Sequence, residues 1–107
     1  MSKVIELNDQ TFKKALEAAP LALVDFYANW CGPCRLFSPL FEKTAEHHED
    51  IFFFKIDGDT NPVSRSEVTI ENLPYIAAFK NGRFVGGLST TMEDALHSFI
   101  KSLKEQS

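Results

Sequence analysis

The sequence predicts an α/β domain in which helices flank both faces of a central mixed β-sheet, in the order β-α-β-α-β-α-β-β-α. Nearly continuous apolar runs at 21–28 and 50–57 are typical of central strands covered on both faces. Segments between and after these runs carry apolar residues at helical spacing, so the early strands must cross over helices and run parallel. Near the C-terminus, Asn81-Gly82 joins two strand-like runs, as in an antiparallel hairpin.

The chain begins with a predicted strand followed by a helix. Residues 3–7 alternate between apolar and polar side chains, as in a short strand. Residues 8–19 have helical spacing, with Asn8 or Asp9 as the expected cap, and Pro20 is expected to stop this helix. The apolar face of the helix comprises Phe12, Ala15, Leu16 and Ala19.

A longer helix is predicted over 31–48. Pro39 lies inside its pattern and should kink the helix rather than end it, because the apolar spacing continues beyond it. After the strand at 50–57, residues 58–68 predict a loop and a short helix with Pro62 near its first turn. The apolar positions of the longer helix are Leu36, Phe37, Leu40, Phe41 and Ala45.

The last part of the chain predicts the hairpin at 75–88 and a closing helix at 90–103. Thr90 and Glu93 have the spacing of a capping box. No internal repeat, linker or low-complexity segment interrupts the pattern, so residues 1–107 are expected to form a single domain. The apolar stripe of the closing helix comprises Met92, Ala95, Leu96, Phe99, Ile100 and Leu103.

The composition argues against several classes of function. Hydrophobic residues make up 44% of the chain and charged residues 24%, which argues against disorder, and ten phenylalanines supply much of a core. The formal charge of −4, without a cluster of Lys or Arg, makes nucleic acid and anionic membranes poor partners. The sequence shows no signal peptide and no apolar run near the ~18 residues of a membrane span. We therefore expect a cytoplasmic monomer, in a compartment where lasting structural disulfides are uncommon.

The only two cysteines, Cys31 and Cys34, stand within one helical turn of each other. Four readings compete: a structural disulfide, half of a zinc site, two inert core thiols, or a redox pair that opens and closes. Unpaired N–H groups and the dipole at the start of the predicted helix stabilise a thiolate, so Cys31 is primed to attack a disulfide sulfur. Cys34 lies on the same face, close enough to close a disulfide with Cys31 and so resolve a mixed disulfide.

The sequence gives little support to the zinc and inert-thiol readings. Zinc needs two further N or S ligands, and His47, His48 and His97 form no recognisable ligand pair with the cysteines. We therefore expect no metal within the chain, while a site shared by two chains stays open. The cysteine spacing and the helix start argue against inert thiols.

The sequence resembles the thioredoxin family over nearly its whole length. The resemblance is carried by "VDFYANWCGPCR", "FFKIDGDTNP", "LPYIAAFKNG" and the closing helix, in the family's order and spacing. It implies the thioredoxin fold, which agrees with the element order predicted above. It also implies dithiol-disulfide exchange, with Cys31 as the attacking thiol and Cys34 as the resolving one.

The resemblance gives roles to two charged residues in the predicted sheet. Asp25 matches the family's buried acid, which helps to deprotonate the resolving cysteine. A carboxylate between Val24 and Phe26 is costly to bury, and a raised pKa would suit it to proton transfer near neutral pH. Lys55 matches the lysine that faces this acid from the next strand. The alternatives are a hydrogen-bonded polar residue for Asp25 and a strand lysine reaching water for Lys55.

The resemblance also implies a substrate-binding surface. Pro74 matches the family's cis-proline beside the active site, and the backbone of Leu73 just before it pairs with an extended substrate segment. Trp30, Gly32 and Pro33 belong to the same surface, and a Gly-Pro pair accompanies the reducing members of the family. Packing and helix-start roles are the alternatives for Trp30 and Pro33.

Three positions depart from the family's pattern and concern substrate range. Tyr75 stands where thioredoxins usually carry threonine and is expected to narrow or reshape the substrate groove. Thr90 stands where a glycine commonly lets the partner's backbone approach closely. Tyr27 occupies a position that is often tryptophan in bacterial members.

The sequence thus predicts a protein-disulfide reductase that keeps cytosolic protein thiols reduced. By resemblance, its partners are disulfide-containing proteins and a flavin-dependent thioredoxin reductase drawing on NADPH. No Gly-rich dinucleotide fingerprint is present, so no bound cofactor is expected besides the redox-active disulfide. An oxidase or isomerase is a rival within the same chemistry. A binding or redox-sensing module, using the surface of Pro74, Tyr75 and Thr90, is a rival from another class.

Overall fold

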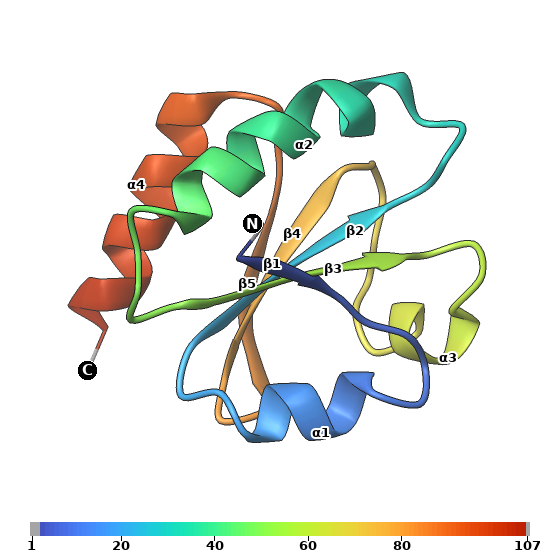
Figure 1. Ribbon diagram of the computed structural model, residues 1–107, viewed down its shortest axis with the longest axis horizontal. Coiled ribbons are helices and arrows are strands. Elements are labelled where there is room, and N and C mark those ends of the chain that lie inside the picture. Colours follow the sequence, from blue (N-terminus) through green and yellow to red (C-terminus); the bar gives the residue numbers. More distant parts are fainter. Residues whose placement is uncertain (1–2, 107) are drawn as a thin grey trace.

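The computed structural model describes residues 3–106, and within them a mixed five-stranded sheet lies between helices (Figure 1). The strands are β1 (Val4–Glu6), β2 (Ala22–Tyr27), β3 (Phe52–Asp57), β4 (Tyr75–Lys80) and β5 (Arg83–Ser89). The helices are α1 (Phe12–Glu17), α2 (Gly32–Ala45), α3 (Pro62–Arg65) and α4 (Glu93–Glu105). The elements follow one another in the predicted order, which confirms the predicted fold class.

The spatial order of the strands is β1-β3-β2-β4-β5. β1 and β2 both pair with β3 in parallel, whereas β4 pairs antiparallel with β2 and with β5. The strand β2 is buried from Ala22 to Phe26, as its nearly continuous apolar run predicts. Asp25 on this strand lies between Lys55 of β3 and Ile76 of β4 in the sheet register.

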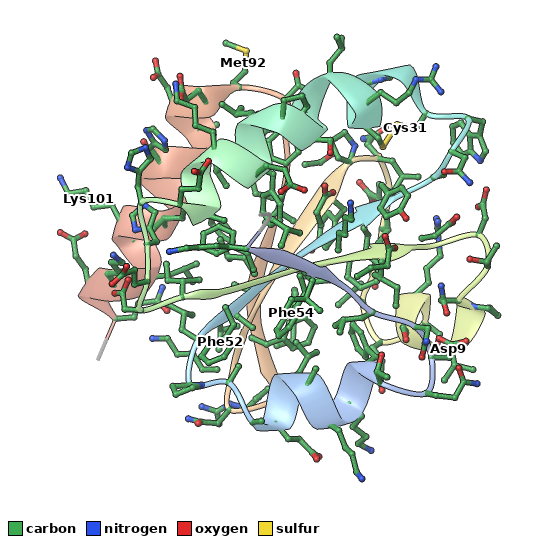
Figure 2. The ribbon with its side chains drawn as sticks, viewed as in Figure 1. Asp9, Cys31, Phe52, Phe54, Met92 and Lys101 are labelled. Carbon is green, nitrogen blue, oxygen red and sulfur yellow. A yellow bond between two sulfur atoms is a disulfide. The ribbon has the colours of Figure 1, made fainter. Side chains whose placement is uncertain are left out.

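Helices cover both faces of the sheet. Figure 1 shows α2 and α4 on one side and α1 and α3 on the other. The two faces have separate cores, and Figure 2 shows Phe54 on the α1 side. Members of the core under α2 and α4 are Phe37, Phe41, Leu96, Ile100 and Leu103. Members of the core toward α1 are Phe12, Leu16, Phe26, Phe54 and Phe79.

The hairpin between β4 and β5 has the predicted turn. Asn81 and Gly82 both have positive φ, 52° and 86°, which is the conformation of a two-residue type I′ turn. A side chain at Gly82 would also come within 3.0 Å of Glu17. The short helix α3 begins at Pro62, in agreement with the prediction that Pro62 lies near its first turn.

Two residues predicted to lie on apolar helix faces are instead exposed. Leu36 is 79% exposed because Phe37, one residue on, takes the buried face of α2, and neighbouring residues point about 100° apart on a helix. Met92 is 64% exposed because it is the extended N-cap residue before α4, outside the helical stripe. The helix α2 does continue past Pro39, as predicted, and ends at Ala45 rather than at residue 48.

Neither Asn8 nor Asp9 is the N-cap of α1, so the predicted cap of this helix was wrong. The N-cap position of α1 is Thr11, and Asn8 instead accepts hydrogen bonds from the N–H groups of Gln10 and Thr11 in the preceding turn. Asp9 accepts from the N–H and hydroxyl groups of Ser64, so it holds α3 rather than α1.

The capping box predicted before α4 does not form. This helix begins at Glu93, and the Thr90 hydroxyl accepts the N–H of Met92 in the turn before it. Among residues 3–106, no helix is both long and apolar enough to cross a membrane.

Candidate active site

A disulfide joins Cys31 and Cys34 at the start of α2. Cys31 is the N-cap residue of the helix, and its Sγ accepts the N–H of Cys34 at 3.1 Å. The N-cap position places this sulfur among the unpaired N–H groups of the first turn, where a thiolate is stabilised after reduction. Both cysteines are only 3% exposed, so a substrate must dock closely to reach them.

Asp25 is a buried acid on the strand that leads into this site. Its side chain is 3% exposed, and no hydrogen bond from residues 3–106 reaches its Oδ1. Burial raises the pKa of Asp25 to about 7; the positive charge of Lys55 opposes this shift, and the negative charge of Glu6 adds to it. The carboxyl can therefore exchange a proton near neutral pH.

A cavity of about 370 Å³ connects Asp25 with Cys34, since both residues line it. Tyr27 and Lys55 line it as well. These charged and polar residues line part of the space, which is large enough to admit water. Cys34 and Asp25 therefore border one space that water can enter.

Lys55 lies opposite Asp25 in the β2–β3 register, but its ion pairs are made with other residues. Its Nζ is 3.9 Å from Glu6 Oε1 and 3.9 Å from Glu42 Oε2. Glu6 also accepts a hydrogen bond of 2.6 Å from the hydroxyl of Tyr27. The sequence analysis missed Glu6, because nothing in a strand pattern indicates which strand becomes its neighbour.

A groove of about 420 Å³ runs beside the disulfide, between the start of α2 and the segment before β4. It brings together most of the predicted substrate-binding residues. Those that line it are Trp30, Gly32, Pro33 and Leu73, together with Cys31.

Trp30 projects from this groove with 70% of its surface exposed. Its Nε1–H donates to Asp59 Oδ2 at 2.6 Å, which fixes the orientation of the ring. Asp59 is a second residue that the sequence analysis missed. Its place in a loop directly after β3 was the available signal, because loops at strand ends commonly carry functional groups.

The Leu73-Pro74 peptide bond is cis, as the resemblance implied. Pro74 is buried, and the hydroxyl of Ser89 on β5 donates to the carbonyl oxygens of Pro74 at 3.0 Å and Asn72 at 3.1 Å. This contact holds the segment before β4 against the sheet edge. The backbone of Leu73 is thereby fixed beside the disulfide.

Tyr75 and Thr90, which were predicted to contribute to the substrate surface, are not among the residues that line this groove. The ring of Tyr75 lies over Gly87, so closely that a Cβ at Gly87 would overlap it, and it packs with the core toward α1. Thr90 is half-buried, and its hydroxyl oxygen accepts the N–H of Met92. Their influence on substrates remains a prediction.

In the described part of the chain, no group of three or more His, Cys, Asp or Glu is arranged to hold a metal ion. The groups that the site presents are two cysteine sulfurs and one buried carboxyl. A pair of sulfurs at a helix start, with a buried acid and a groove beside them, is suited to thiol-disulfide exchange.

Comparison with known proteins gives consistent matches. The family model named Thioredoxin matches residues 3–102. Human thioredoxin is 35% identical over 105 residues, which cover 96% of this chain and 99% of the human protein. A thioredoxin from Alicyclobacillus acidocaldarius is 41% identical over 78 residues, covering 72% of this chain and 74% of that protein. The crystal structure of spinach chloroplast thioredoxin f (long form) superposes with a TM-score of 0.89 at 30% identity, covering 95% of this chain and 87% of that one.

Proposed function

The chain belongs to the thioredoxin family of disulfide oxidoreductases, and on that premise we propose that it is a protein-disulfide reductase. The observation that carries this proposal is the Cys31–Cys34 disulfide at the start of α2, beside an open groove. In the reduced protein, Cys31 is the attacking thiolate and Cys34 is the resolving thiol.

Reduction of a substrate takes two exchange steps. The Cys31 thiolate attacks one sulfur of the substrate disulfide; a bond forms between them, and the other substrate sulfur leaves as a thiolate. Cys34 then loses its proton and attacks Sγ of Cys31, which releases the second substrate sulfur. Two electrons pass from the protein dithiol to the substrate, and the protein ends as the Cys31–Cys34 disulfide.

Asp25 accepts the proton of Cys34 in the second step. Its burial and its place with Cys34 on one cavity support this role. A pKa of about 7 lets the carboxyl take up and release a proton near neutral pH.

The groove beside the disulfide holds an extended segment of the substrate. We assign the contacts to Trp30, Gly32 and Pro33 on one wall and to the backbone of Leu73 before Pro74 on the other. These positions are supported by the lining of the groove and by the hydrogen bonds with which Ser89 holds the segment before β4.

The oxidised protein must be reduced again by an external donor. The family supports a thioredoxin reductase in that role, with disulfide-containing proteins as substrates and no bound cofactor besides the disulfide. In this proposal residues 1–107 act as one domain and as a monomer in the cytoplasm, where they keep protein thiols reduced.

The test is reduction of insulin disulfides, supplied with electrons first by dithiothreitol and then by NADPH with a thioredoxin reductase. We expect turnover with both donors and its loss in Cys31→Ser and Cys34→Ser. Turnover with dithiothreitol alone would contradict the proposed donor but keep the chemistry. No turnover with either donor would contradict the reductase and favour a binding module.

A further inference from the structure

The ammonium group of Lys55 makes its ion pairs with residues other than Asp25, the buried acid opposite it in the strand register. Its Nζ makes ion pairs of 3.9 Å with Glu6 Oε1 and 3.9 Å with Glu42 Oε2. Within residues 3–106, no ion pair joins it to Asp25, although the two residues are register partners on adjacent strands. Lys55 therefore acts on Asp25 as a nearby positive charge and not as an ion-pair partner.

Glu6 is itself held in place from a third strand. Its Oε2 accepts a hydrogen bond of 2.6 Å from the hydroxyl of Tyr27, while its Oε1 faces Lys55. Burial, and next the hydrogen bond to Glu6, raise the pKa of Tyr27, so the phenol stays protonated and remains a donor. Tyr27, Glu6 and Lys55 thus form a fixed arrangement across β2, β1 and β3.

We infer that Glu6, held by Tyr27, is a positioning residue for the resolving step: it draws the Lys55 ammonium away from Asp25 and so sets the pH range in which Asp25 accepts a proton from Cys34. The inference rests on the proposed function, because it assigns a control to the proton transfer of that same site. Tyr27 and Lys55 both line the cavity shared by Asp25 and Cys34, so the arrangement lies directly at the path of the proton.

The charges around Asp25 change its pKa in the directions that this positioning role requires. Lys55 on β3 lowers the pKa of Asp25, and Glu6 on β1 raises it, against a background of burial that raises it most. On α2, Glu42 shares Lys55 with Glu6, and the guanidinium of Arg35 donates to the carbonyl oxygen of Asn29. Removing the charge of Glu6 therefore acts twice in one direction, since it removes a negative charge and leaves Lys55 paired with Glu42 alone.

The direct test is the titration of the Asp25 carboxyl, followed by carboxyl carbon NMR in the full-length oxidised protein. In Glu6→Gln, we expect its midpoint to fall by about one pH unit, the size expected for one charge at this range in a protein interior. Glu49→Gln is the matched control, because it removes the same charge from an exposed ion pair with Lys3. Its midpoint should stay within about 0.2 units of the wild type. An unchanged or raised midpoint in Glu6→Gln would overturn the inference.

Tyr27→Phe tests the part that the phenol plays. Without its donor, Glu6 holds Lys55 less firmly, so the Asp25 midpoint should also fall, by less than in Glu6→Gln. A rise would contradict the positioning role of Tyr27.

A kinetic readout connects the titration to the reaction. The pH profile for release of a peptide from its mixed disulfide with Cys31 should move with the Asp25 midpoint in Glu6→Gln. In an Asp25→Asn background, Glu6→Gln should no longer shift the pH profile of peptide release. A shift of this profile that persists without Asp25 would show that Glu6 does not act through Asp25. Because the NMR titration needs no turnover, failure of this inference is distinguishable from failure of the proposed reductase.

Discussion

The carboxyl group of Asp25 illustrates how one residue couples stability to chemistry. It lies on the most buried strand of the sheet, without a hydrogen bond to Oδ1 among the described residues. Burying a carboxylate is costly, so the fold favours its protonated form. The same cost that weakens the fold at high pH provides a proton acceptor that works near neutrality.

Replacing Asp25 by Asn should therefore stabilise the oxidised protein at high pH. The pKa of Asp25 is raised from 3.8 to about 7, so the folded state binds more protons than the unfolded state between these values. The free-energy cost of ionising Asp25 in the folded protein is absent below pH 3. It grows as the pH rises from 4 to 7 and is complete above 7. At pH 8 the free energy of unfolding should rise by up to about 4 kcal/mol, at ~1.4 kcal/mol for each pKa unit.

Denaturant unfolding at pH 3 and pH 8 measures this effect. Glu67→Gln, which removes an exposed carboxylate, is the control and should change little at either pH. An equal gain at both pH values would mean that the ionisation of Asp25 is not the cause.

At the scale of elements, β4 and β5 depend on a pairing of a large and a small residue. The ring of Tyr75 occupies the space over Gly87, whereas a Cβ at Gly86 would meet only Phe99 at an ordinary 3.8 Å. Gly87→Ala should lower the free energy of unfolding by about 1–3 kcal/mol, as overpacking does. Gly86→Ala should cost clearly less.

The double variant Tyr75→Thr, Gly87→Ala completes this test. If the clash with the ring is the cause, the two changes are coupled and the double variant is more stable than the sum of the single effects predicts. Additive effects in denaturant unfolding would contradict the proposed contact.

The helix α2 should tolerate changes on one face only. Phe41 is 1% exposed, so Phe41→Ala should cost about 3–5 kcal/mol through the cavity that it leaves. Leu36→Ala should cost less than about 0.5 kcal/mol, because Leu36 projects into solvent. Thermal or denaturant unfolding distinguishes the two, and a similar loss in both would contradict the burial described here.

Elements were predictable where local chemistry determines them. Asn81 and Gly82 specify their turn, Pro62 marks the start of α3, and the apolar run of β2 requires cover on both faces. The exposure of Leu36 was not predicted, because spacing alone does not distinguish the edge of an apolar stripe from its centre. The exposure of Met92 was not predicted, because spacing does not distinguish the first helical residue from the N-cap before it.

Across the whole molecule, the sequence predicted a mixed sheet but not its strand order. The order β1-β3-β2-β4-β5 places Glu6 beside Lys55, although the two are far apart in the chain. The same order brings β2 between its parallel and antiparallel neighbours, so the start of α2 meets the segment before β4. Contacts such as Trp30 with Asp59 and Tyr27 with Glu6 follow from this assembly and could not be inferred from local patterns.

Trapping of the mixed disulfide is the most direct test of the central claim, which is that Cys31 attacks and Cys34 resolves. Reduced Cys34→Ser and Cys31→Ser proteins are each mixed with a peptide disulfide and examined by mass spectrometry. We predict one stable peptide adduct on Cys31 in Cys34→Ser, and none at a comparable rate in Cys31→Ser. An adduct that forms as fast on Cys34, or no adduct on Cys31, would contradict the account.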